Sequence, residues 1–157
     1  IAEINGVATA AGCQLVASCD LAYSSENSKF ATPGVNIGLF CSTPMVALSR
    51  VVKNKHAMEM LLTGDFIQAD KAKSIGLINN FFKEEDLTKE TILIANKIAN
   101  KSSLTLSIGK KAFYNQSEMK ISDAYNYASE VMIKNMMESD SEEGIKAFIE
   151  KRKPNWN

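Results

Sequence analysis

Short apolar runs alternate with helical periodicity through the first half of the chain. Strands are predicted over residues 1–5, 21–24, 30–32 and 77–82, and helices over residues 10–18, 56–62 and 69–74. Ser42, Thr43 and Pro44 suit an N-cap and a first turn, so another helix is expected to begin there. Gly64 and Gly76 follow two of the helices, as glycine commonly does. Strand–helix–strand order favours parallel pairing and an α/β layer.

Residues 84–157 carry no strand signal and four helical patterns instead. In each of three patterns the residues share one face of a helix. The three sets are Leu87, Thr91, Ile94, Ala95 and Ile98; Leu104, Ile108 and Ala112; and Ala124, Ala128, Val131, Met132, Asn135 and Met136. The fourth opens at Ser139 and Glu142, which have capping-box spacing, and Pro154 is expected to end it. Basic residues 151–153 would then occupy its last turn and complement the helix dipole. The chain is therefore expected to divide into an α/β part, 1–83, and a helical part, 84–157.

Composition narrows the classes of function. Lys plus Arg and Asp plus Glu number 18 each, so no overall field points to nucleic acid. No apolar run approaches the ~18 residues of a membrane span. Cys13, Cys19 and Cys41 lack a disulfide or zinc spacing, which favours a reducing, intracellular setting. Ile1 lies inside a strand-like run, so we expect the C-terminal part of a longer protein.

The most suggestive local chemistry is the small-residue turn Ala10-Ala11-Gly12 at the start of a predicted helix. The first N–H groups of a helix lack intrahelical acceptors, and small side chains let a carbonyl oxygen approach them. Such donors can stabilise an oxyanion, although packing alone is the commoner reason for such a turn. Gln14 lies one turn further on; it can orient water or bind a polar acyl group, or simply bond to neighbouring backbone.

The remaining candidates have plain structural explanations. Gly34 follows Pro33, as expected of a turn. Cys41 precedes a predicted helix N-terminus, which lowers a thiol pKa, but no histidine is near in sequence and a buried, inert cysteine is favoured. Cys13 and Cys19 are expected in the core. His56, the only histidine of the sequence, is expected to be structural.

Taken together, these motifs resemble the crotonase (enoyl-CoA hydratase/isomerase) family. The resemblance rests on residues 4–15, 19–22, 30–38, 57–64, 69–77 and 143–153, and it covers nearly the whole chain. It implies a ClpP-like superhelix of strand-strand-helix units followed by an α-helical trimerisation region, in a homotrimer or hexamer. It also implies an acyl-CoA or enoyl-CoA thioester partner, with coenzyme A only as part of the substrate. No tightly bound cofactor, metal, nucleic acid or membrane is implied, and the location is mitochondrial in a eukaryote and cytoplasmic otherwise.

The resemblance also assigns residues. In the family, the N–H at the position of Ala11 is one of two oxyanion donors, and the other comes from an upstream segment that this sequence lacks. The family's hydratases carry glutamates at the positions of Gln14 and Gly34, so the acid–base pair is replaced. Gly34 is expected to leave a vacancy that a bulkier substrate could fill. Related dehalogenases place a catalytic Asp at about Ser42, beside Cys41.

The terminal motif is assigned in the same way. The family packs the residue matching Phe148 near the adenine of coenzyme A. It pairs the residue matching Lys151 with a phosphate of coenzyme A bound by a neighbouring subunit. From the residues alone, Phe148 is an apolar anchor and Lys151 a partner for the helix dipole. The resemblance favours coenzyme A contact instead, which needs a trimer.

The expected function is that of an acyl-CoA thioester-binding protein of fatty-acid metabolism that stabilises a thioester oxyanion. By family it is enoyl-CoA hydratase-like, a lyase, but classical hydration is doubtful without the glutamates. Two alternatives stay open. One is a non-catalytic acyl-CoA-binding or regulatory protein. The other is a thioester hydrolase or decarboxylase, which needs the oxyanion donors and a different helper.

Overall fold

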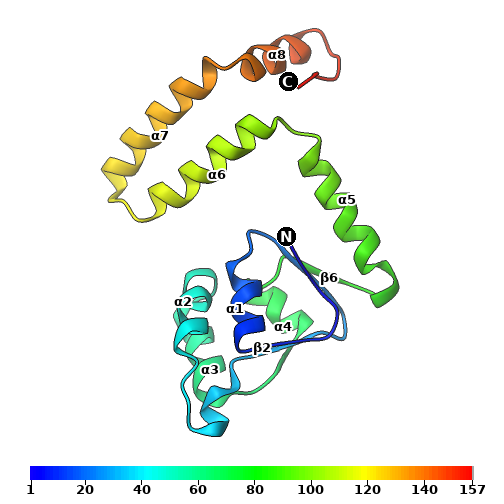
Figure 1. Ribbon diagram of the computed structural model, residues 1–157, viewed down its shortest axis with the longest axis vertical. Coiled ribbons are helices and arrows are strands. Elements are labelled where there is room, and N and C mark those ends of the chain that lie inside the picture. The colour runs from blue at the N-terminus through cyan, green and yellow to red at the C-terminus, as the bar shows by residue number, and fades with distance from the viewer. Residues whose placement is uncertain (157) are drawn as a thin grey trace. The chain divides into compact units, whose positions relative to one another are not determined.

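The computed structural model describes residues 1–156, and the chain forms two compact units, Ile1–Ala95 and Asn96–Asn157. In Figure 1 the first unit, blue to green, contains all the strands of the described residues. The predicted boundary after residue 83 follows the last of these strands, whereas the first compact unit extends into α5 (Leu87–Ala99). The extension arises because Leu87 and Thr91 are buried and Thr88 Oγ1 donates to Glu3 Oε1 at 2.7 Å.

Two three-stranded sheets form the framework of the first unit. One has the order β1 (Ala2–Ile4), β3 (Ala22–Ser25), β6 (Asn80–Phe82), and the other β2 (Val7–Thr9), β4 (Lys29–Ala31), β5 (Ile67–Gln68). The β1–β3, β3–β6 and β2–β4 pairs are parallel, which confirms the expected pairing, and β4–β5 is antiparallel. β2 and β5 are additional to the predicted strands: β5 has only two residues, and β2 runs directly into the turn at Ala10.

Four α-helices and one 3₁₀ turn complete the α/β part. They are α1 (Ala11–Ser18), η1 (Pro33–Ile37), α2 (Ser42–Val51), α3 (Asn54–Thr63) and α4 (Ala69–Ser74). α1 packs against α2, and the core between helices and sheets contains the fully buried side chains of Phe30, Leu48, Met60 and Leu61. α3 ends as predicted at Gly64, whose φ of 69° is a left-handed conformation that glycine adopts without strain.

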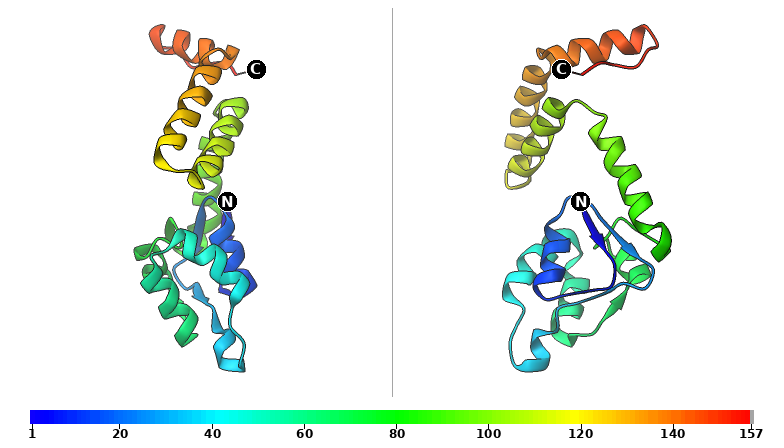
Figure 2. Two further views of the ribbon diagram at one scale, coloured as in Figure 1. Left: turned by 90° about the vertical axis from the view of Figure 1, so that its left-hand side faces the viewer. Right: turned by 45° about the vertical axis from the view of Figure 1, so that its right-hand side comes forward.

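The second unit is helical, as expected. α6 (Ser103–Ser117) and α7 (Ile121–Met136) form a hairpin, followed by α8 (Ser139–Ile149), as Figures 1 and 2 show. Ser102 caps α6 by accepting from Thr105 N–H at 3.0 Å, and its hydroxyl lies 2.5 Å from the carboxylate of Asp140. Ser102 and Asp140 are both buried, so this polar pair ties the start of α6 to the first turn of α8.

Both predicted side-chain caps are wrong. Cys41, not Ser42, is the N-cap of α2, and Ser42 Oγ donates to the carbonyl of Phe40 at 3.3 Å instead. The N-cap of α8 is Glu138, with no side-chain cap hydrogen bond. The capping box fails because Ser139 is the first residue of the helix and not its N-cap. Ser141 Oγ, in the same turn, donates to the carbonyl of Asn135.

The predicted end of the last helix is also wrong. α8 ends at Ile149, so residues 151–153 lie beyond its last turn. Lys151 has a φ of 54°, and the chain reverses there rather than continuing as a helix to Pro154. None of the described helices is long and apolar enough to cross a membrane.

Candidate functional site

The turn that opens α1 has an unusual backbone. Ala10 adopts φ 46° and ψ −111°, a combination that residues with a side chain rarely populate. Its N–H donates to the carbonyl of Ala31 at 3.0 Å, and its carbonyl accepts from Gln14 N–H at 3.0 Å. Ala11 is then the first residue of the helix, where its N–H has no intrahelical acceptor. Within residues 1–156 this N–H has no acceptor at all, so the turn presents a free donor at an exposed residue.

Gln14 lies on the same first turn of α1 and is half-buried. Its main-chain carbonyl accepts from Ser18 Oγ at 2.8 Å, but its side-chain amide has no hydrogen-bond partner in the part of the chain that the structure describes. A carboxamide can donate and accept a hydrogen bond but does not titrate near neutral pH. Gln14 can therefore orient a polar group beside the Ala11 donor, and it cannot remove a proton.

Strand register brings the second part of the site to the same place. β2 and β4 pair in parallel with Thr9 opposite Ala31, so the chain leaves both strands at one edge of the sheet. Residues 10–14 follow one strand and residues 32–34 follow the other. Thr32 lies between β4 and η1, is fully buried, and its Oγ1 lacks a partner among the described residues. No motif in the sequence singles out Thr32, because its environment depends on this pairing.

The space beside Gly34 is filled, which corrects the expected vacancy. A Cβ atom added at Gly34 would lie 2.8 Å from the carbonyl oxygen of Leu39 and 2.9 Å from Cys41 Sγ. Gly34 N–H donates to Cys41 Sγ at 3.3 Å, and Leu39 N–H donates to the carbonyl of Gly34 at 3.0 Å. The chain after η1 thus turns back on itself and places the Cys41 thiol where a side chain at 34 would begin.

The cysteines of the site are core residues. Burial raises the pKa of the Cys13 thiol to about 12, and the nearby Cys41 thiol adds to the rise. Cys13 therefore stays protonated at neutral pH and is a poor nucleophile. Cys41 is also buried, with its sulfur against Gly34, whereas Cys19 is only partly buried. Cys13 lies in the core and Cys41 is buried, as expected, whereas the expectation that Cys19 lies in the core is wrong. The inertness of Cys41 stays a prediction.

The first unit contains five of the predicted site residues: Ala11, Gln14, Gly34, Cys41 and Ser42. Ser42 is exposed at the start of α2. His56 is on α3, where Nδ1 lies 3.8 Å from Glu59 Oε2. No group of three or more His, Cys, Asp or Glu within residues 1–156 is placed to hold a metal ion.

The two predicted coenzyme A contacts lie in the second unit. Phe148 is on α8 with 85% of its side chain exposed, and Lys151 follows the helix at the chain reversal. No ion-pair partner of Lys151 occurs in the described part of the chain.

Comparison with known proteins identifies the family. A family profile described as enoyl-CoA hydratase/isomerase matches residues 1–157. The chain therefore belongs to this family, the crotonases, as the motifs had suggested. The α/β crotonase fold is confirmed by an enoyl-CoA hydratase structure from Mycobacterium smegmatis, with a TM-score of 0.95 and 49% identity over 98% of this chain and 61% of that one.

Within the family, the chain is similar to enoyl-CoA hydratase domain-containing protein 3. It is 55% identical to the mitochondrial Xenopus laevis protein of that name over 156 residues, 99% of this chain and 53% of that protein. The human protein's crystal structure matches with a TM-score of 0.94 and 53% identity, covering 96% of this chain and 60% of that one. The segments 8–15 and 40–44 predict similarity to this branch, and the comparisons confirm it. The chain spans about half the length of the curated relatives it matches.

Proposed function

We propose that the chain is the C-terminal part of a crotonase-fold protein that binds acyl-CoA thioesters and stabilises the thioester oxyanion without efficiently hydrating enoyl-CoA. The observation that carries the proposal is the Ala11 N–H, which has no acceptor among the described residues and follows the strained Ala10 at the start of the helix turn that also carries Gln14. A donor fixed in this way needs no reorganisation when negative charge develops on a thioester oxygen.

The hydration step lacks its acid and base at the two assigned positions. An amide and a glycine stand where the family's hydratases carry glutamates. General acid–base catalysis contributes roughly 10²–10⁴-fold, so its loss lowers turnover steeply while leaving the oxyanion donor in place. The Cys41 thiol beside Gly34 does not substitute for a carboxylate, because it is buried and hydrogen-bonded to the Gly34 N–H.

The helical unit supports a homotrimer or hexamer, which we include in the proposal. Apolar side chains of α7 and α8 are widely exposed: Met132 60%, Met136 60%, Phe148 85% and Ile149 72%. A cavity of about 490 Å³ at the α7–α8 junction is lined partly by Met136, Met137, Ile145 and Ile149. Many large apolar side chains exposed on neighbouring helices are typical of a protein interface. In that assembly Phe148 and Lys151 would contact the adenine and a phosphate of coenzyme A bound by a neighbouring subunit.

The similarity to mitochondrial relatives supports a mitochondrial location. A place in fatty-acid metabolism is part of the proposal. The binding claim is tested by isothermal titration calorimetry of the full-length protein with butyryl-CoA. Saturable binding at one site per subunit is expected. A folded protein that shows no heat of binding would contradict the proposal. Measurable butyryl-CoA cleavage during the titration would favour the thioester hydrolase alternative.

A further inference from the structure

The end of α8 is held in a strained reversal. Glu150 N–H donates to the carbonyl of Lys146 at 2.9 Å, and Arg152 N–H then reaches back to the carbonyl of Ala147 at 3.0 Å. Lys151 lies between these two residues and has a φ of 54°, a left-handed conformation that residues with a side chain rarely adopt. Such a conformation persists only where the surrounding structure determines it.

An ion-pair cluster supplies one part of that support. The Arg152 guanidinium contacts both carboxylate oxygens of Glu143, at 2.6 Å and 2.8 Å, and its Nε donates to Glu150 Oε2 at 2.6 Å. Glu143 Oε1 also accepts from Asn155 N–H at 2.7 Å. Hydrogen bonds from Arg152 and then Asn155 lower the pKa of Glu143 to about 2, so the cluster is charged at neutral pH. Two-point Arg–carboxylate contacts fix geometry as well as charge.

The indole of Trp156 supplies the other part. Its Nε1 donates to the carbonyl of Asn100 at 2.9 Å, which fixes the chain's end to the residue after α5. The ring also lies over Gly144, where an added Cβ would be 3.3 Å from Trp156 Cη2. Residues 152–156 therefore run back along α8 and are anchored at both ends. We call Glu143, Arg152 and Trp156 the C-terminal clasp.

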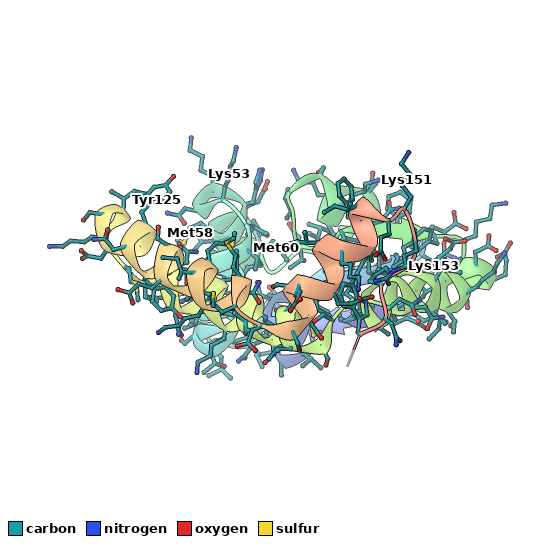
Figure 3. All side chains as sticks on the ribbon, turned by 90° about the horizontal axis from the view of Figure 1, so that it is seen from above. Lys53, Met58, Met60, Tyr125, Lys151 and Lys153 are labelled. Atoms are coloured by element: carbon teal, nitrogen blue, oxygen red, sulfur yellow. The ribbon has the colours of Figure 1, made fainter. Side chains whose placement is uncertain are left out.

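The clasp has a consequence for the charges at this end of the unit. The charge of Arg152 is already paired with two carboxylates, those of Glu143 and Glu150. Lys151 stands at the apex of the reversal, and Figure 3 shows its side chain extended away from the ribbon. A lysine in the left-handed conformation projects in a different direction from one that continues a helix. The clasp thus determines where the Lys151 ammonium lies relative to the exposed Phe148 on α8.

We propose that the C-terminal clasp positions Lys151 for a phosphate group of bound acyl-CoA, so that Glu143, Arg152 and Trp156 are positioning residues of that site. The proposal rests on the proposed function, because it takes coenzyme A as the anion that Lys151 meets. It adds three residues that would not touch the ligand, and it predicts that their effect on binding passes through Lys151 alone.

The experiment is a double-mutant cycle on the full-length protein, with coenzyme A affinity measured by calorimetry. Glu143→Gln keeps the side chain's shape and removes the charge that holds Arg152. It should weaken coenzyme A binding roughly 3- to 10-fold, the effect of about one hydrogen bond. Lys151→Ala should weaken it at least as much. In the Lys151→Ala background, Glu143→Gln should have no further effect, since the group it positions is gone.

Controls separate positioning from general damage. Glu142→Gln removes the same charge from an exposed neighbour and should leave affinity unchanged. Trp156→Phe removes the indole N–H but keeps a ring over Gly144. It should weaken coenzyme A binding as Glu143→Gln does, and it replaces Glu143→Gln as the test if the Glu143→Gln protein folds poorly. Pantetheine, which lacks the nucleotide phosphates, should bind all variants equally.

The outcomes distinguish the two proposals. Failure of the wild type to bind coenzyme A would contradict the proposed function and the clasp together. Loss of affinity in Lys151→Ala, with none in Glu143→Gln or Trp156→Phe, would overturn the clasp and leave the proposed function standing. Equal losses from Glu143→Gln with and without Lys151 would also overturn the clasp, because the effect would not pass through that lysine.

Discussion

Replacement of Gly34 by alanine gives the sharpest test of how the site is packed. The added Cβ would meet the Leu39 carbonyl oxygen at 2.8 Å and Cys41 Sγ at 2.9 Å. Real Cβ atoms do not approach other atoms this closely, and a backbone carbonyl cannot rotate away. Overpacking of a filled site typically destabilises by about 1–3 kcal/mol, and we expect the upper part of that range. At roughly 2–4 °C per kcal/mol, Tm should fall by about 4–12 °C.

The assay is chemical and thermal denaturation of the full-length protein, with Gly12→Ala as the matched control. A Cβ at Gly12 would have only Ala8 Cβ nearby, at 3.9 Å, so this control should lose nothing. Removing the thiol with Cys41→Ala should relieve one of the two clashes. The double variant should then be more stable than the sum of the two single effects predicts. A Gly34→Ala protein as stable as wild type would refute the inference that the Cys41 thiol fills this space.

Three further predictions concern stability. Ala10→Gly should raise the free energy of unfolding by roughly 1 kcal/mol, because it relieves the φ of 46°, and a destabilised variant in urea denaturation would contradict this. Ser102→Ala should lower it by about 1–3 kcal/mol by removing the α6 cap and a partner of buried Asp140; an unchanged urea midpoint would refute that role. Cys13 should make stability fall between pH 9 and 12, since the pKa of the thiol is near its ordinary value of 9.0 in the unfolded chain and about 12 in the folded one. Stability is therefore retained below pH 9 and lost as pH rises, and Cys13→Ala should flatten that part of the urea midpoint against pH.

Local signals in the sequence predicted much of the first unit. Glycine after a periodic stretch correctly marked the end of α3, and strand–helix–strand order correctly indicated parallel pairing. Both signals work because they depend on residues close in sequence. β2 and β5 were not predicted because β5 has only two residues and β2 runs directly into the small-residue turn at Ala10, and both form only through pairing with β4.

The parts of the site that the sequence did not predict depend on contacts across loops. Glycine at 34 indicated a turn or an empty position, and only folding brings Cys41 into that space. The end of α8 was predicted too late because basic residues and a proline are typical of a last turn. Their actual arrangement depends on the ion pair between Arg152 and Glu143, which lies nine residues earlier, near the start of α8. Pattern alone could not distinguish these outcomes.

The central claim, that this site keeps a thioester oxyanion donor but has lost hydratase chemistry, is tested most directly by crotonyl-CoA turnover. The full-length protein, shown to bind an acyl-CoA, would be mixed with crotonyl-CoA and the loss of the conjugated thioester followed by absorbance. The account predicts no hydration above the uncatalysed rate, because Gln14 and Gly34 cannot transfer protons. Robust turnover that survives Gln14→Ala would contradict it, since other residues would then be supplying the acid and the base.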